Sequence, residues 1–300
     1  MTMNSVSHQK IIWLMIESAV GWGLWWIPVR ALTSLGMSEV WAGVLPIFAA
    51  GLGMIALLKW QNLNPLNLDA AAKYGGLLFG IAISFYGVAL ALTDVVRAAL
   101  FFYLAPIWAL IIETIWLRVR LSWHGPVGAA ICLLGILILF EFQVALDQLN
   151  LGDIMATLSG LAFSIGSTCI FSGHRRLRNQ NRHIRITSIM LISGAFCGTA
   201  MLFLFNEPIG SVDDIGWGIL IVLTTGILLL APISFIMQIG AERLLPATLA
   251  LLYTGEIATS VVTAAIFLPF EQFGWAEGIG ALLIAGAGLA QLFRPQNEEV

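Results

Sequence analysis

Charged side chains are scarce in this sequence. Asp, Glu, Lys and Arg together make up 10% of its 300 residues, whereas a soluble domain carries about 25%. Hydrophobic residues reach 59%, and the mean hydropathy is +0.92, so most of the chain is expected to lie in lipid. Because a membrane span needs about 20 apolar residues, the chain has room for about ten spans and none for a soluble catalytic domain.

Cysteines and catalytic motifs are scarce as well. The three cysteines lie inside apolar runs without CxxC spacing, which excludes a disulfide framework and a thiolate metal site; they are Cys132, Cys169 and Cys197. The sequence has no Walker loop, GxSxG elbow or HExxH pattern. No lysine lies within a span where it could carry a retinal Schiff base. We therefore expect no cofactor, no metal and no enzymatic activity.

Ten apolar runs, bounded by polar residues, Gly or Pro, are each long enough to span as a helix. They cover about 11–29, 40–58, 75–93, 98–117, 125–142, 151–172, 186–205, 216–238, 246–268 and 274–293. The first run is not followed by a small-residue cleavage site and is too long for a signal-peptide core, so we interpret it as a retained helix.

The placement of Lys and Arg predicts the orientation. With ten spans and a cytoplasmic N-terminus, only Arg30 and Arg97 of the 14 basic residues fall on the outer side. The other twelve fall on the inner side: Lys10, Lys59, Lys73, Arg118, Arg120, Arg175, Arg176, Arg178, Arg182, Arg185, Arg243 and Arg294. This bias predicts a multi-pass inner-membrane protein with both termini in the cytoplasm.

An internal repeat divides the chain in two. At a fixed offset of 150 residues, Ile83-Ser84-Phe85 matches Ile233-Ser234-Phe235, and Tyr103 matches Tyr253. We therefore expect an all-α integral membrane fold with five helices in residues 1–145 and five in 146–300. Because each half has an odd number of spans, the two halves have opposite orientations, a design typical of secondary transporters.

Three acids fall within predicted spans, where a carboxylate is costly and usually faces a bundle interior or a wet cavity. They are Glu17, Glu113 and Glu256, and each is a candidate for proton or ion coupling. Glu256 is expected near the middle of the membrane and Glu17 in its inner third. Glu113 is close to Arg118 and could instead reach toward the cytoplasmic surface.

Polar residues at helical spacing mark candidate binding faces. Tyr253, Glu256, Ser260 and Thr263 share one face of the ninth run. We expect this face to line a cavity, although hydrogen bonding between helices would produce the same pattern. Further substrate-binding candidates are Ser18 and Trp22 in the first run, Ser84 in the third, Tyr103 in the fourth, and Ser234 and Gln238 in the eighth.

Three stretches carry a likeness to known proteins: Trp22-Gly23 followed by Pro28, the stretch from Ala91 through Ala105-Pro106, and the Gly128 to Gly135 helix. With these and its two sets of five helices, the sequence resembles the EamA-like branch of the drug/metabolite transporter superfamily. It is most similar to bacterial exporters of amino acids, aromatic ones above all. The resemblance implies a central cavity lined by helices 1, 3, 4, 6, 8 and 9, with helices 5 and 10 at the periphery.

The predicted function is export of a small organic solute by alternating access, with aromatic or other neutral amino acids favoured. Because no Lys or Arg falls in a span core, phosphorylated solutes fit less well than neutral, zwitterionic or cationic ones. A multidrug or other metabolite exporter of the same fold is the alternative, followed by a channel or a membrane scaffold. The expected partners are membrane lipid and the solute, with no nucleic acid, and a monomer is favoured.

Overall fold

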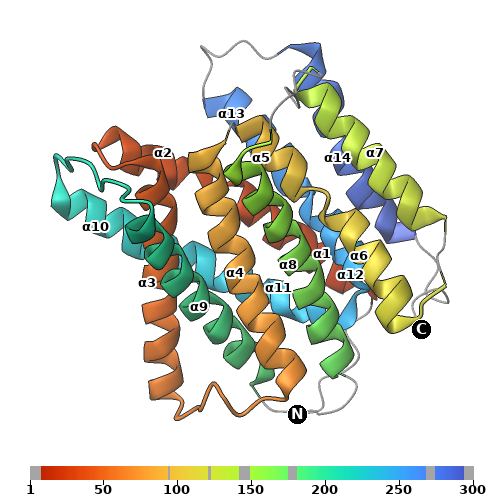
Figure 1. Ribbon diagram of the computed structural model, residues 1–300, viewed down its shortest axis with the longest axis horizontal. Helices are drawn as coiled ribbons and strands as arrows, with labels where there is room; N and C mark the ends of the chain where they lie inside the picture. The colour runs from red at the N-terminus through yellow and green to blue at the C-terminus, as the bar shows by residue number, and fades with distance from the viewer. Residues whose placement is uncertain are drawn as a thin grey trace.

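The computed structural model describes residues 8–93, 95–120, 123–141, 149–174, 181–267 and 274–293, and most of the chain in these ranges is helical (Figure 1). The elements are α1 (His8–Gly23), α2 (Trp26–Ser34), α3 (Glu39–Trp60), α4 (Ala70–Leu92), α5 (Val95–Phe102), α6 (Ala105–Ile112), η1 (Glu113–Leu117), α7 (His124–Leu139), α8 (Leu151–His174), α9 (Arg182–Leu204), α10 (Ile215–Thr224), η2 (Thr225–Leu230), α11 (Ala231–Arg243), α12 (Pro246–Tyr253), α13 (Gly255–Phe267), α14 (Trp275–Leu289) and η3 (Ala290–Phe293).

These elements form helical segments in the predicted order. Among the described residues, eight segments are long and apolar enough to cross a membrane. They are His8–Ser34, Glu39–Trp60, Ala70–Leu90, Arg97–Leu117, Leu151–Gly173, Arg182–Leu204, Ile215–Arg243 and Pro246–Phe267. The other two predicted spans are the shorter apolar helices α7 and α14. The all-α membrane fold is therefore confirmed, with a fifth helix shorter than expected and a tenth that ends in the 3-10 turn η3.

Four of the predicted spans are interrupted near their middle. The first divides into α1 and α2, the fourth into α5 and α6, the eighth into α10 and α11 around the π-helix η2, and the ninth into α12 and α13. Pro28, Pro106 and Pro232 explain the first three, because a proline removes a backbone donor and its ring presses on the carbonyl four residues earlier.

The ninth span breaks without a proline. The Thr254 hydroxyl donates to the Leu251 carbonyl over 2.6 Å, which competes with the backbone ladder at that turn. Gly255 follows directly and has low helix propensity. The breaks at Tyr103–Leu104 and at Thr254 lie close to the 150-residue offset of the sequence repeat.

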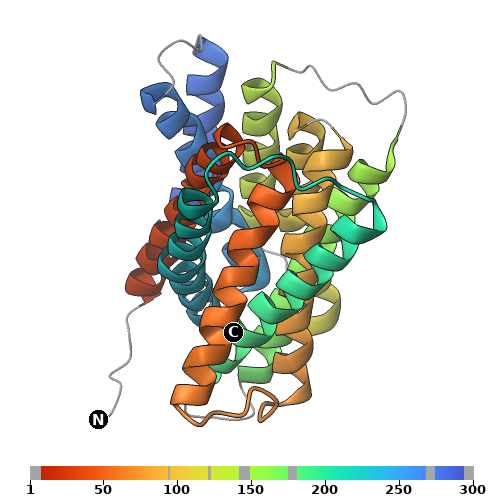
Figure 2. The same ribbon diagram turned by 90° about the vertical axis from the view of Figure 1, so that its left-hand side faces the viewer.

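Small residues let the central helices pack closely. A Cβ placed on Gly80 of α4 would come within 2.7 Å of the Gly194 backbone nitrogen of α9, so only a glycine fits there. The α4 helix also packs along α8, and α7 packs along α14. Figure 2 shows α3, in orange, running along the height of the bundle, where it packs against α9 and α4.

Each end of the bundle is held by a buried charge network. At one end, Arg182 pairs with Asp69 and donates from Nε to Glu242 Oε1 over 2.7 Å, which joins the starts of α4 and α9 to the end of α11. At the other end, Arg97 pairs with Asp153, linking α5 to the start of α8. The loop at 61–69 lies at the bottom of Figures 1 and 2, with the Asp69 network.

Candidate functional site

A cavity of about 490 Å³ lies where the interrupted helices meet. Its wall is largely aromatic: the rings are those of Trp22, Trp25, Trp26, Phe79, Tyr86, Phe102, Tyr103, Phe140, Phe163 and Tyr253. The cavity extends from buried Phe79 and Met237 to the exposed Glu39 at the start of α3, so it reaches the surface at one end. A concave site with an apolar wall and few polar groups is the usual form of a small-molecule site.

The breaks in the helices bring backbone and side chains to this cavity. Trp25 lies at the break between α1 and α2, Tyr103 at the break before α6, and Tyr253 directly before the break at Thr254. Interrupted helices of this kind surround the solute sites of many secondary transporters, because the freed backbone groups can contact a solute.

Glu256 is the carboxylate that lies deepest in the cavity. It accepts a hydrogen bond from the Tyr103 hydroxyl, so residues 153 positions apart in the sequence meet across the bundle. The Tyr253 and Ser18 hydroxyls are hydrogen-bonded over 2.6 Å one turn away. Among the described residues that line the cavity are two acids, Glu39 and Glu256, and no Lys, Arg or His.

Two indole N–H groups of the wall have no hydrogen-bond partner among the described residues. They belong to Trp22 and Trp25, whose ring centroids lie 5.4 Å apart at 75°. The neighbouring Trp26 differs, since its Nε1 donates to Thr263 Oγ1 over 3.0 Å. A buried donor without a partner is costly, so Trp22 and Trp25 are two donors that a polar solute could satisfy.

The predicted binding residues divide into two groups. Trp22, Tyr103, Tyr253 and Glu256 line the cavity, and the structure brings them together from three interrupted spans. Ser18, Ser84, Ser234 and Gln238 are buried outside its lining. The expectation that these four line the cavity is therefore not met in this conformation.

Their contacts give the physical reason. The Ser18 hydroxyl donates to the Ile233 carbonyl over 2.8 Å as well as bonding Tyr253, so it holds α1 against α11. The Ser84 hydroxyl donates to the Gly194 carbonyl over 2.7 Å and so ties α4 to α9. The Gln238 amide nitrogen contacts the Met190 sulfur at 3.2 Å. Contacts between helices, rather than solute contact, place Ser18, Ser84 and Gln238. The buried Ser234 hydroxyl has no hydrogen-bond partner among the described residues.

The polar face of the ninth span combines both expected uses. Tyr253, Glu256 and Ser260 line the cavity. Ser260 also donates to the Gly23 carbonyl over 2.9 Å, and Thr263 accepts from Trp26 outside the cavity lining. The face therefore serves the cavity at one end and fastens α13 to the first span at the other.

The other two acids lie away from the cavity. Glu17 is exposed on the outer face of α1, beside the exposed side chains of Trp13 and Val20. Glu113 is buried, and its Oε2 accepts from the Ala247 backbone N–H over 3.2 Å. It therefore caps the N-terminus of α12 instead of reaching the cytoplasmic surface.

Several lining residues were not singled out in the sequence. Trp25, Tyr86, Phe102 and Phe163 escaped notice because aromatic residues in a membrane span look the same in a cavity wall and in a packed core. One helix expected to be peripheral, the fifth, also contributes, since Phe140 at the end of α7 lies in the wall. The helix-breaking Pro28 and Pro106 were the available signals, because they place the aromatic residues beside them at a break.

The model of the EamA-like transporter family matches residues 9–141. Among solved structures 26 chains match, and one of them, titled "Crystal structure of protein", has a TM-score of 0.71 and 20% identity over 94% of this chain and 96% of that chain. That identity shows a shared fold alone. No curated protein matches the sequence. Residues 9–141 are thus an EamA-like transporter family domain, consistent with the drug/metabolite transporter superfamily.

Proposed function

We propose that the protein is a secondary transporter that exports small zwitterionic solutes, aromatic and other neutral amino acids foremost, by alternating access through the central cavity. The family match supports a membrane transporter of small solutes. The observation that carries the finer proposal is the pairing, in one aromatic cavity, of a carboxylate at Glu256 with the two partnerless donors of Trp22 and Trp25.

The polar groups of the cavity complement an amino acid. The Glu256 carboxylate and the Tyr103 hydroxyl suit an ammonium group, and the Trp22 and Trp25 indole N–H groups suit a carboxylate. The remaining rings suit an apolar or aromatic side chain, and their faces also attract a cation. A phosphorylated solute would meet two acids and no cation, which disfavours it.

Residues 1–145 and 146–300 are proposed to form the two inverted halves that move against each other. Support comes from the breaks at Tyr103–Leu104 and Thr254, which lie close to the 150-residue offset of the repeat. The cavity reaches the surface at Glu39 and is closed toward the Asp69–Arg182–Glu242 network. If both termini lie in the cytoplasm, as the charge bias predicts, the cavity opening at Glu39 faces the outer side of the inner membrane.

A multidrug exporter of the same fold is the second candidate. It is favoured by the size of the aromatic wall, which would accept lipophilic cations of many shapes beside Glu256. A channel or scaffold would need no site of this kind.

Solute counterflow in proteoliposomes tests the proposal. Vesicles loaded with unlabelled solute are diluted into labelled Phe, Leu, phenethylamine, phenylacetate, tetraphenylphosphonium or a sugar phosphate. We expect transient accumulation of Phe and Leu above the equilibrium level, weaker accumulation of the amine, and none of phenylacetate or the sugar phosphate. Accumulation of tetraphenylphosphonium alone would favour the multidrug candidate, and equilibration of every solute without accumulation would indicate a channel.

A further inference from the structure

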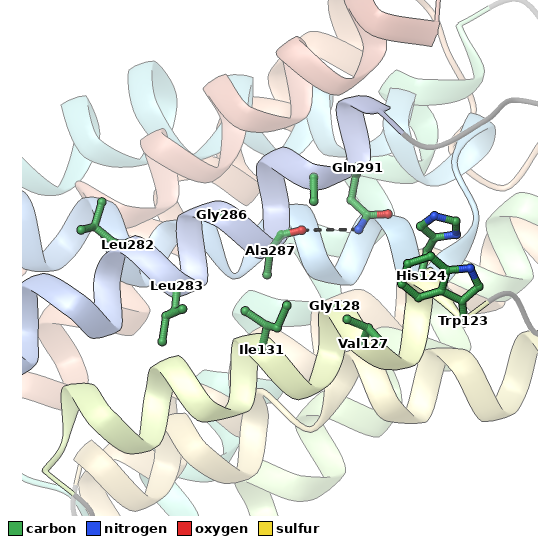
Figure 3. Close-up of a pocket in the computed structure, with 11 residues that line it drawn as sticks. Trp123, His124, Val127, Gly128, Ile131, Leu282, Leu283, Gly286, Ala287 and Gln291 are labelled. Atoms are coloured by element: carbon green, nitrogen blue, oxygen red, sulfur yellow. Dashed lines mark hydrogen bonds between the residues drawn. The ribbon is translucent and has the colours of Figure 1, made fainter.

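A second cavity, of about 390 Å³, lies between α7 and α14 and shares no lining residue with the central one (Figure 3). Both helices are short: α7 has 16 residues and α14 has 15. At 1.5 Å per residue α7 is about 24 Å long, below the roughly 30 Å of the hydrocarbon core, whereas α14 continues directly into the four residues of η3. The groove between them therefore lies on a part of the bundle where lipid has to adapt to the protein.

The groove is apolar along most of its length. Ile131 of α7 and Leu282 of α14 form its exposed walls, with Leu282 74% exposed. Gly286 deepens it, because a Cβ placed there would meet nothing within 4 Å. A groove of this shape along two membrane helices suits a thin, flexible chain such as a lipid acyl tail.

One end of the groove is polar. His124 stacks on Trp123 with ring centroids 4.2 Å apart, and Trp123 is exposed, as expected of an aromatic residue at a membrane surface. Gln291 is only 3% exposed. Its amide nitrogen donates to the Ala287 carbonyl over 3.4 Å, while its Oε1 has no hydrogen-bond partner among the described residues. Figure 3 shows this oxygen directed toward His124.

We propose that this groove is a binding site for one membrane phospholipid with a hydrogen-bond-donating headgroup, of the phosphatidylethanolamine type. The acyl chain lies between α7 and α14 over Gly286, and the ammonium group donates to Gln291 Oε1 beside Trp123. A buried acceptor without a partner is costly, so the site gains most from a headgroup that supplies the missing donor.

A lipid fits this groove better than a helix from a second copy of the protein would. An α-helix with its side chains is about 10–12 Å wide and would rest on the exposed walls at Leu282 without reaching the buried Gln291. A lipid combines the narrow apolar part and the single polar donor that the two ends of the groove require.

Native mass spectrometry of the full chain in mild detergent, with added phosphatidylethanolamine or phosphatidylcholine, tests the site. Wild-type protein should retain one phosphatidylethanolamine about five-fold more than phosphatidylcholine, whose trimethylated amine has no N–H to donate. Gln291→Leu should reduce that ratio to about one. Gly286→Leu should fill the groove and remove most of the adduct of both lipids.

Gly278→Leu is the matched control, because Gly278 is also an exposed glycine of α14, also has open space around a Cβ, and lies outside the groove. It should retain lipid as the wild type does. Equal retention of the two lipids by the wild-type protein would overturn the headgroup assignment. Equal retention by the Gly286 and Gly278 variants, or a protein dimer that Gly286→Leu dissociates, would overturn the lipid site itself.

Discussion

Three neighbouring tryptophans in the first span show how different the roles of one residue type are. The indole N–H of Trp26 donates to Thr263, whereas the buried N–H groups of Trp22 and Trp25, two residues of the cavity wall, have no partner among the described residues. Burying a donor in this way costs free energy that folding alone does not recover. The two donors therefore belong to the solute site in the proposed function.

Replacing each of these two indoles by a ring without a donor should weaken the binding of amino acids more than the binding of the corresponding amines. For Trp22→Phe and Trp25→Phe we expect the KM for a zwitterionic amino acid to rise about five- to ten-fold, because one hydrogen bond to a charged group is lost. The KM for the matching decarboxylated amine should change less than about two-fold, since the amine has no carboxylate to accept that bond.

Trp26→Phe is the control for this experiment, because it removes an indole N–H that is already bound to Thr263. Trp26→Phe should change the KM for the amino acid and the KM for the amine by the same factor. Initial uptake rates in vesicles, at matched amounts of protein, provide the comparison. An equal rise in KM for acid and amine in the Trp22 and Trp25 variants would assign the two indoles to packing alone.

At the scale of elements, Glu113 connects one interrupted span to another. Its carboxylate caps α12, an eight-residue helix whose first backbone N–H groups would otherwise lack partners. Glu113→Gln keeps an acceptor oxygen and should transport at close to the wild-type rate. Glu113→Leu removes the acceptor and should lower the free energy of unfolding by about 1–3 kcal/mol. Loss of transport in a stable Glu113→Gln protein would instead support the ion-coupling role predicted from the sequence.

The Asp69–Arg182–Glu242 network should be among the least replaceable features of the closed end. Removing Arg182 leaves two carboxylates facing each other, of which Glu242 is 3% exposed. Breaking a buried charge pair by removing one partner costs about 3–5 kcal/mol. Arg182→Met should therefore lower the thermal unfolding midpoint in detergent by several degrees, whereas Lys59→Met, at an exposed position, should not. Similar midpoints for the two variants would show that the network contributes little to closing this end.

At the scale of the whole molecule, the charge bias predicts which end faces the cytoplasm. The loop with Leu66 and the Arg182 network share one end, and the loop with Ser211 lies at the end where Met37 pairs with Gly210. In a background without the natural cysteines, a membrane-impermeant maleimide applied to intact cells should label Ser211→Cys and leave Leu66→Cys unlabelled. The opposite result, or labelling of Gln180→Cys from outside, would contradict the topology.

The sequence predicted the arrangement of the spans better than the details of the site. Long apolar runs report burial in lipid directly, so the all-helical membrane fold followed from them. Glu256 and its tyrosines were found because a polar group is costly in a span. Trp25 and Phe163 were not, because apolar rings look the same in a wall and in a packed core.

The same ambiguity explains the misplaced residues. A serine in a span marks either a cavity or a hydrogen bond between helices, and the Gly194 carbonyl opposite Ser84 decides for the latter only in three dimensions. Glu17 lies within a predicted span but faces away from the cavity. The direction in which its side chain points depends on how α1 packs, which the sequence alone does not show. Parts of the basic inner loop, including Arg175, Arg176 and Arg178, lie outside the described residues.

Solute is proposed to bind at Glu256 inside the cavity, and Glu17 offers a matched carboxylate outside it. Counterflow of a labelled neutral amino acid should be measured for Glu256→Gln, Glu256→Leu, Glu17→Gln and Glu17→Leu in the same vesicles. We predict that Glu256→Gln loses at least about ten-fold in initial rate, since it loses a charge-assisted bond to the ammonium group, and that Glu256→Leu loses more. Both Glu17 variants should match the wild type. Wild-type rates for both Glu256 variants across neutral and mildly acidic pH would contradict the claim and leave Glu256 a structural residue.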